Sequence, residues 1–132
     1  MVVSDKDKVK IEFIVSRNRR IALPCIAFVS NSSLSKGLMF VDKMSRSVGA
    51  LFIFEKSGYH SAWMKNTRIP LDIIWVSEEG IVCEIVSGKP HDETSIGGNV
   101  SSRYMIEVVR GYVEAHSIRK GMRIKVRKIE EE

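Results

Sequence analysis

Much of this chain alternates apolar and polar residues with the period of two that a β-strand requires. Between residues 8 and 15, Val9, Ile11 and Phe13 alternate with lysine and glutamate, as expected of a strand with one face in water. The same period returns in a last predicted strand, residues 122–129. Its apolar face comprises Met122, Ile124 and Val126, and its opposite face carries Arg123, Lys125 and Arg127.

Other apolar runs predict further strands, at residues 21–28, 49–54, 71–76, 81–86 and 104–109. The run 49–54 is apolar on both faces, which is typical of a central strand. Pro24 cannot donate to a β-ladder, so we expect its strand to lie at a sheet edge or to be broken by a bulge. Trp63 and Met64 are assigned to the end of a short strand. Turns are predicted at residues 55–58 and 77–80, the second as a hairpin.

Helical spacing is confined to short segments. Leu34 and Leu38 recur at helical spacing, which predicts a helix over residues 33–39. Residues 112–116 can form a second helix, and one more helical turn is expected around Met44. About seven short strands with two small helices indicate the α+β class, mainly β. We expect a strongly curved antiparallel sheet or a partly closed barrel.

Composition is that of an ordinary globular protein. The 132 residues are 44% apolar and 28% charged, which favours a single domain with its core at residues 9–127. No apolar run approaches the roughly 18 residues of a membrane span, and no signal peptide is recognisable. We therefore expect a cytoplasmic protein with no membrane partner. Cys25 and Cys83 lie in apolar runs and are expected to be reduced thiols. The oligomeric state stays open.

The largest side chains and the densest polar cluster meet at residues 62–75. Trp63 is followed by a cation, an amide, a hydroxyl and a carboxylate, which are Lys65, Asn66, Thr67 and Asp72. Polar groups between two apolar runs suggest a pocket. The first hypothesis is therefore a non-catalytic domain that binds a small polar or anionic ligand here. The loop between Ser87 and Arg103 is expected to cover the pocket as a flap.

Two alternatives use the same residues differently. Asp72 and Lys65 could form the acid and base of a hydrolase, because burial beside a cation tunes the pKa of either group. In a structural alternative, Asp72 caps backbone amides, Asn66 and Thr67 bond turn carbonyls, and Trp63 belongs to the core.

Metal and cofactor chemistry find little support in the sequence. His60, His91 and His116 are scattered, and there is no C-x-x-C or H-x-x-x-H spacing. Gly97-Gly98-Asn99 lacks the lysine and the helix of a phosphate-binding loop, so loop flexibility is the simpler explanation of its glycines. We expect no metal and no cofactor.

The charge balance suggests a third hypothesis. There are 21 lysines and arginines against 16 acidic residues, a net charge of +5. The row formed by Arg123, Lys125 and Arg127 could follow the phosphates of a nucleic acid. However, lysine and arginine on a strand also discourage edge pairing. This strand also lacks the aromatic residues that interleave with charge in many single-strand binders.

Several motifs together resemble a known family. They are Gly37-Leu38-Met39-Phe40, Gly49-Ala50-Leu51-Phe52-Ile53-Phe54, Trp63-Met64-Lys65-Asn66-Thr67-Arg68-Ile69-Pro70-Leu71-Asp72-Ile73-Ile74, and the runs 104–109 and 118–126. The family is the uncharacterised domain of unknown function 192, and the resemblance covers residues 9–127. It implies a compact, mostly β domain and no particular activity. Val41 and Ala62 depart from the family pattern, which commonly has arginine and often an aromatic residue at these positions.

Overall fold

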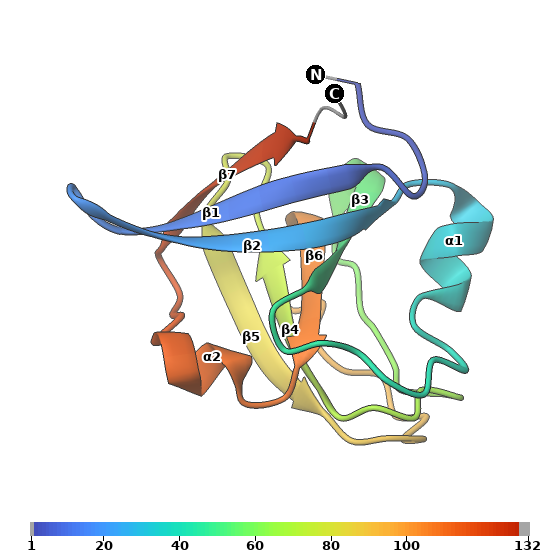
Figure 1. Cartoon of the computed structure of the whole chain (residues 1–132). Coiled ribbons are helices and arrows are strands. Elements are labelled where there is room, and N and C mark those ends of the chain that lie inside the picture. Colours follow the sequence, from blue (N-terminus) through green and yellow to red (C-terminus); the bar gives the residue numbers. More distant parts are fainter. Residues whose placement is uncertain (1, 130–132) are drawn as a thin grey trace.

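The computed structural model describes residues 2–129, which form strands and two short helices. In chain order the elements are β1 (Lys8–Ser16), β2 (Arg19–Phe28), α1 (Asn31–Lys36), β3 (Gly49–Gly58), β4 (Leu71–Val76), β5 (Val82–Gly88), β6 (Ser102–Val109), α2 (Tyr112–His116) and β7 (Arg123–Lys128). The predicted α+β class, mainly β, is confirmed. Figure 1 shows α1 and α2 on opposite sides of the molecule.

The strands form one curled sheet in the order β5-β4-β6-β3-β2-β1-β7. All neighbouring pairs are antiparallel except β2 and β3, which run parallel because α1 and the chain to residue 48 connect them. The two edges of the sheet approach each other at one end. There the amide of Val82 donates to the carbonyl of Met122, and the amide of Gly121 donates to the carbonyl of Val82, both at 2.8 Å. The sheet is therefore a partly closed barrel, as predicted.

Apolar side chains pack on both faces of the central strands. Successive side chains of a strand point to opposite faces. In β4, Ile74 and Val76 consequently pack inside the barrel with Phe13 and Val108. The alternate positions of β4 pack outside. This outer layer contains Leu71, Ile73 and Trp75 from β4, Ala50 and Phe52 from β3, Met105 from β6, and Met64 and Ile69. All residues of β4 are therefore buried, although only one face lines the barrel.

Three strand-level predictions need correction. The strand containing Pro24 is internal, because β2 lies between β1 and β3. The ladder to β3 begins only at Cys25, so Pro24 has a partner on the β1 side alone and its missing donor breaks no pairing. The predicted turn at residues 55–58 is wrong, since β3 continues to Gly58. The predicted strand at Trp63 is also wrong, since pairing there is limited to an isolated bridge at Ala62.

The helices begin and end close to the predicted positions. α1 starts two residues earlier than predicted, because the hydroxyl of Ser30 caps it by accepting from the amide of Ser33 at 3.2 Å. It also ends earlier, at Lys36, and no helical turn forms around Met44. α2 occupies the predicted residues. Cys25 and Cys83 are free, as predicted. Among residues 2–129, no helix has the length and apolar character needed to span a membrane.

The loop after β5 lies along the segment that contains Trp63. Ala62 and Ile96 exchange backbone hydrogen bonds of 2.8 Å in both directions, and the amide of Met64 donates to the carbonyl of Asp92 at 2.8 Å. Gly97 lies against the indole of Trp75, where an added Cβ would come within 2.3 Å of the ring. The glycine at this position is thus required by a close approach to Trp75, which the explanation by flexibility did not include.

We expect Gly97→Ala to lower the free energy of unfolding by on the order of 3 kcal/mol, from overpacking against Trp75 and from left-handed strain at φ +68°. Gly121→Ala is the matched control, because Gly121 also has a positive φ, +92°, but an added Cβ there meets nothing within 4 Å. Urea unfolding of both variants measures the difference. Equal losses in the two variants would contradict the packing role of Gly97.

Candidate functional site

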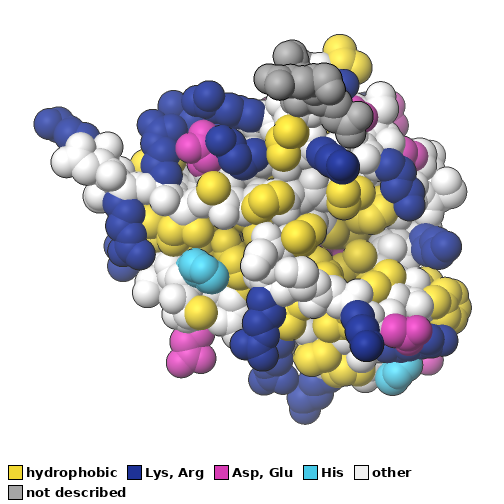
Figure 2. All heavy atoms as spheres, in the orientation of Figure 1, with side chains coloured by type: hydrophobic (Ala, Val, Ile, Leu, Met, Phe, Trp, Pro, Cys, Tyr) yellow, Lys and Arg dark blue, Asp and Glu magenta, His cyan; other side chains and the backbone are white. Residues whose placement is uncertain are grey.

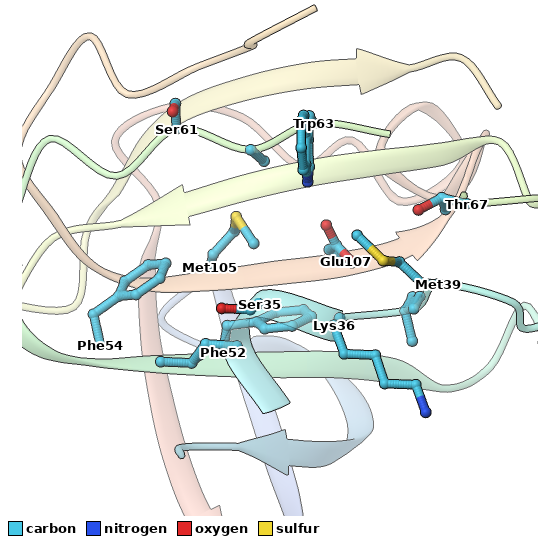
Figure 3. A pocket seen from close by; sticks show the side chains of 14 residues that line it. Ser35, Lys36, Met39, Phe52, Phe54, Ser61, Trp63, Thr67, Met105 and Glu107 are labelled. Atoms are coloured by element: carbon cyan, nitrogen blue, oxygen red, sulfur yellow. The ribbon is translucent and has the colours of Figure 1, made fainter. Parts of the chain in front are cut away.

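A cavity of about 200 Å³ opens on the outer face of the sheet, between α1, β3, β6 and the segment around Trp63. Its lining combines apolar and aromatic side chains with polar groups, and slightly more of its accessible surface is polar than apolar. The lining residues are Leu34, Ser35, Lys36, Gly37, Leu38, Met39, Phe52, Phe54, Ser61, Ala62, Trp63, Thr67, Met105 and Glu107. Figure 3 shows Trp63 on one side of this space and Phe52 with Ser35 on the other, with Glu107 between them. A concave site in which aromatic and aliphatic side chains meet convergent polar groups is typical of small-ligand binding.

Trp63 forms a wall of the cavity and stays accessible. Its side chain is 46% exposed, whereas its neighbour Met64 is buried beneath the same segment. The ammonium of Lys65 lies 5.1 Å from the centre of the Trp63 ring. Trp63 is therefore a large aromatic surface that is not consumed by the core, and it is held in place by the burial of Met64.

Glu107 lies at the floor of the cavity. It is only 6% exposed, although it stands in a strand covered on both faces. Its neighbours across the ladders are Ala50 of β3 and Ile73 of β4, both in the outer apolar layer. Within residues 2–129, no hydrogen bond or ion pair engages its carboxyl. Burial raises the pKa of Glu107 to about 8, because no partner compensates the desolvation of the carboxylate.

The residues predicted for the pocket separate into two groups. Trp63 and Thr67 line the cavity, and the hydroxyl of Thr67 donates to the carbonyl of Lys65 at 3.3 Å. Lys65 and Asn66 do not line it. Asn66 adopts a positive φ of 54° in the turn, and its carbonyl accepts from the amide of Phe40 at 2.9 Å. No residue of the predicted flap lines the cavity; the loop lies beside the Trp63 segment instead.

Asp72 lies on the opposite face of the sheet from the cavity. Asp72 and Ile74 are two residues apart in β4, so their side chains lie on the same face of the sheet, inside the barrel. On this face the side chain of Asp72 points toward α2. One carboxylate oxygen accepts from the amides of Gly111 and Val113 at 3.0 and 3.1 Å, and the other accepts from the Ser87 hydroxyl at 3.0 Å. These bonds are those of the structural alternative, in which Asp72 caps backbone amides. The structure does not bring Asp72 and Lys65 together as an acid–base pair.

Sequence reasoning did not select Glu107 as a site residue, although a signal was present. It is the one charged residue within the apolar run 105–109, where a strand covered on both faces should have none without a partner. The other cavity walls come from α1 and the three residues after it, from β3, and from Met105 of β6. Their proximity depends on tertiary packing, for which the local sequence carries no signal.

The scattered histidines do not form a metal site among the described residues. No group of three or more histidine, cysteine or acidic side chains there is arranged to hold a metal ion. His60 instead stacks on Phe54 with ring centres 3.8 Å apart, and its Nε2 lies 2.8 Å from the carbonyl of Lys56.

The basic surface predicted on the last strand, β7, continues onto the neighbouring strands β1 and β2. β7 pairs with β1, which sets Arg127 opposite Lys10 and Arg123 opposite Ile14, and Ile14 in turn lies opposite Arg20 of β2. Glu12 is the acidic residue on this face, and it pairs with Arg127 at 3.3 Å and Arg20 at 3.7 Å. Figure 2 shows basic side chains gathered near β7 and at the tip of the β1–β2 hairpin. The face therefore carries more cations than the sequence of one strand indicated.

Comparisons with known proteins agree with the resemblance read from the motifs. A family model described as "Uncharacterized ACR" matches residues 16–126. A crystal structure from Sinorhizobium meliloti, provisionally described as a transcription regulator, is similar with a TM-score of 0.88 and 27% identity, over 95% of this chain and 98% of that one. A protein of unknown function from Novosphingobium aromaticivorans is similar with a TM-score of 0.81 and 25% identity, over 89% and 84% of the two chains. No curated protein matches the chain.

The family match extends over most of the chain and includes the cavity walls, Glu107 and the strand around Asp72. The matched region begins at residue 16, at the end of β1, and ends at residue 126, within β7. It therefore covers β2 to β6 completely and most of β7, but only the last residue of β1. The chain belongs to the family known as domain of unknown function 192, which is uncharacterised.

Proposed function

We propose that this protein is a small-ligand-binding domain and that the ligand occupies the cavity beside Trp63. The observation that carries the proposal is the carboxyl of Glu107, which lies at the floor of the cavity and has no hydrogen-bond or ion-pair partner among residues 2–129. A buried polar group without a hydrogen bond costs stability, so a fold that keeps one at an open cavity favours a partner from outside.

The walls support binding of an organic molecule rather than water alone. Phe52, Phe54 and Met105 present apolar surface around the carboxyl, and Trp63 adds a half-exposed indole. A cavity of about 200 Å³ is smaller than the roughly 300–1,000 Å³ of typical drug-sized sites, which restricts the ligand to a small molecule.

The proposal is tested with a library of small organic fragments, followed by amide chemical shifts in two-dimensional NMR. Bound fragments are expected to shift the amides of residues 35–39 and the indole N–H of Trp63. Trp63→Ala should weaken binding about tenfold through loss of aromatic contact. Tyr59→Ala is the matched control, because Tyr59 is 75% exposed and does not line the cavity. Fragments that bind equally well to wild type and Trp63→Ala, or that leave these amides unshifted, would contradict the proposal.

A second candidate function is polyanion binding by the outer face of β2, β1 and β7. It is favoured by the register that sets Arg127 opposite Lys10 and Arg123 near Arg20, which extends the basic row across three strands. The Sinorhizobium meliloti protein's description as a regulator of transcription accords with this candidate. The face has no exposed aromatic stacking platform in β7, so the contacts would be to phosphates and independent of sequence.

We expect duplex DNA to bind at low salt with an affinity that falls steeply as salt rises. Replacing Arg123, Lys125 and Arg127 together by alanine should make the slope of log K against log salt shallower by about 2 to 3, because each phosphate contact contributes about 0.9. A control triple variant removes the exposed cations Lys43, Arg46 and Lys56. Undetectable binding at low salt, or an equal effect of both triple variants, would exclude this candidate.

A further inference from the structure

The chemistry of the ligand can be inferred from the atoms that meet at the floor of the cavity, and this inference rests on the proposed function. Glu107 is more than nine-tenths buried, and its carboxyl faces the space between Trp63 and Phe52 (Figure 3). An ionised carboxylate offers acceptor sites only. The group that would complete it is a donor of N–H bonds, and a positively charged donor would also offset the cost of burying the charge.

The walls of the cavity favour a cation as well. Trp63, Phe52 and Phe54 line the cavity, and the face of an aromatic ring attracts a cation placed above it. One face of each ring is already covered, by Lys65, Phe28 and His60 respectively, so a ligand would meet the other side of these rings. Methionine sulfur is polarisable, and Met39 and Met105 line the same space. An apolar ligand body with a cationic head would therefore find complementary surface at each end.

Few other charges face this carboxyl. Lys36 of α1 is the other charged side chain in the lining, and Figure 3 shows its amino group directed away from Glu107. Lys65 lies over the Trp63 ring, on the segment opposite α1. On β6, the guanidinium of Arg103 is held by the carbonyl of Phe54 at 2.6 Å and by Glu78 at 3.0 Å. None of these cations forms an ion pair with Glu107, so the carboxyl is free to accept a cation from the ligand.

Two ionisable groups of neighbouring elements complete the surroundings. His60, next to the lining residue Ser61, is stacked on Phe54 and has its ring nitrogen at the carbonyl of Lys56. Asp72 of β4 lies on the opposite face of the sheet, engaged with Gly111 and Val113. Neither supplies a counter-charge at the floor of the cavity.

We propose that the cavity binds a small organic cation with N–H donors, an amine, amidine or guanidine on an apolar body, through a charge-assisted pair with Glu107. The cationic head lies at the carboxyl, and the body lies between Trp63 and Phe52. A planar head with two parallel N–H groups gains a bidentate contact.

Binding of such a cation is linked to the loss of a proton from Glu107. In the empty cavity the raised pKa of Glu107, about 8, leaves about a tenth of the molecules ionised at pH 7. Since the cation pairs with the ionised form, the apparent dissociation constant at pH 7 is about tenfold weaker than at pH 9. Each binding event near pH 7 also releases about one proton.

The probes are benzamidine, benzamide and benzoate, which share one ring and differ in the charge of the head. Titration calorimetry from about pH 6 to about pH 9 should show benzamidine affinity rising about tenfold per pH unit below the Glu107 pKa and then levelling. The amidinium stays protonated over this range. Benzamide should bind more weakly at pH 9, with no pH dependence, and benzoate should gain nothing as pH rises.

Two variants distinguish the effect of removing the charge of Glu107 from the effect of removing the charge of any buried glutamate. Glu107→Gln should reduce benzamidine affinity at pH 9 to the level of benzamide and abolish the pH dependence. Glu84→Gln is the matched control, because Glu84 is also buried but its carboxylate accepts from the backbone and side chain of Asn99. It should leave the affinities unchanged.

A measurement on the wild type keeps the proposal testable if Glu107→Gln does not fold. Calorimetry in two buffers of different ionisation enthalpy should report release of about one proton per benzamidine at pH 7. Equal affinity for benzamidine and benzamide, or no proton release, would overturn the proposal that the ligand is a cation. The cavity would still stand as a binding site. Failure of the proposed function would give a different result: no fragment, whatever its charge, would shift the amide resonances of the cavity residues.

Discussion

The free energy of unfolding is expected to fall by on the order of 4 kcal/mol as pH rises from about 5 to about 8, because of Glu107 alone. The pKa of this carboxyl is about 8 in the folded protein, against an ordinary value of 4.5. Between those two values the folded state binds one more proton than the unfolded state. Stability is therefore complete below the unfolded pKa and decreases by about 1.4 kcal/mol per pH unit until the folded pKa is reached.

Other shifted groups lie outside this pH range. Hydrogen bonds from Ser30 and Val29 lower the pKa of Asp5 to about 2, so the stability it contributes is lost only in acid. Burial raises the pKa of Cys25 and of Tyr112 to about 12, so their ionisation affects the free energy of unfolding only in strong base. The decline between pH 5 and 8 is thus assigned to Glu107.

Urea unfolding of wild type and Glu107→Gln across this range measures the effect. The variant should have a free energy of unfolding that hardly changes between pH 5 and pH 8, and the Glu84→Gln control should follow the wild type. A wild type whose stability is constant or rises over the range would show that Glu107 is ionised in the folded protein. A cation bound in the cavity should flatten the wild-type curve, because it stabilises the ionised form.

Asp72→Ala is expected to lower the free energy of unfolding by on the order of 3 kcal/mol, since hydrogen bonds to a charged group contribute about 1.5–3 kcal/mol and their loss leaves partners unpaired. The N-cap of α2 is Gly111, which has no side chain, so the carboxylate of Asp72 acts as the cap from a different element. Loss of Asp72 leaves the amides of Gly111 and Val113 and the hydroxyl of Ser87 without their acceptor.

The matched control for this variant is Asp42→Ala. The side chain of Asp42 is 72% exposed, and its contact is one ion pair with Arg68, so the expected change is below about 1 kcal/mol. Thermal or urea unfolding compares the two variants at one pH. Similar stabilities would contradict the structural role of Asp72. Benzamidine affinity should be unaffected by Asp72→Ala in the folded fraction, because Asp72 lies across the sheet from the cavity.

The strand pattern could be predicted from sequence because it depends on local alternation. The run 71–76 is β4, the link at residues 77–80 joins a hairpin, and residues 112–116 are α2. The wrong predictions concern features that depend on which strands pair with each other over long sequence distances. Pro24 is tolerated in an internal strand because the ladder to β3 starts one residue later, which only the register reveals.

The candidate site was predicted less completely, for a related reason. Trp63 and Asp72 are close in the chain, but alternation along β4 places Asp72 on the inner face, beside α2. Glu107 is distant in sequence from Trp63, but pairing of β6 with β3 and β4 places it on the outer face with Ala50 and Ile73. The alternation of the run 71–76 could have shown that Asp72 lies on the same face of the strand as Ile74. The meeting of Trp63 with Glu107 required the sheet order.

The central claim is that Glu107 is protonated and unpartnered in the empty cavity at neutral pH. Carbon NMR of protein labelled at the glutamate side-chain carboxyls tests it most directly, with Glu107→Gln identifying the resonance. We predict one glutamate carboxyl that titrates with a midpoint near pH 8 and is missing from the variant. Titration of every glutamate near the ordinary value of 4.5 would contradict the claim, and with it the reason for placing a cation at the floor of the cavity.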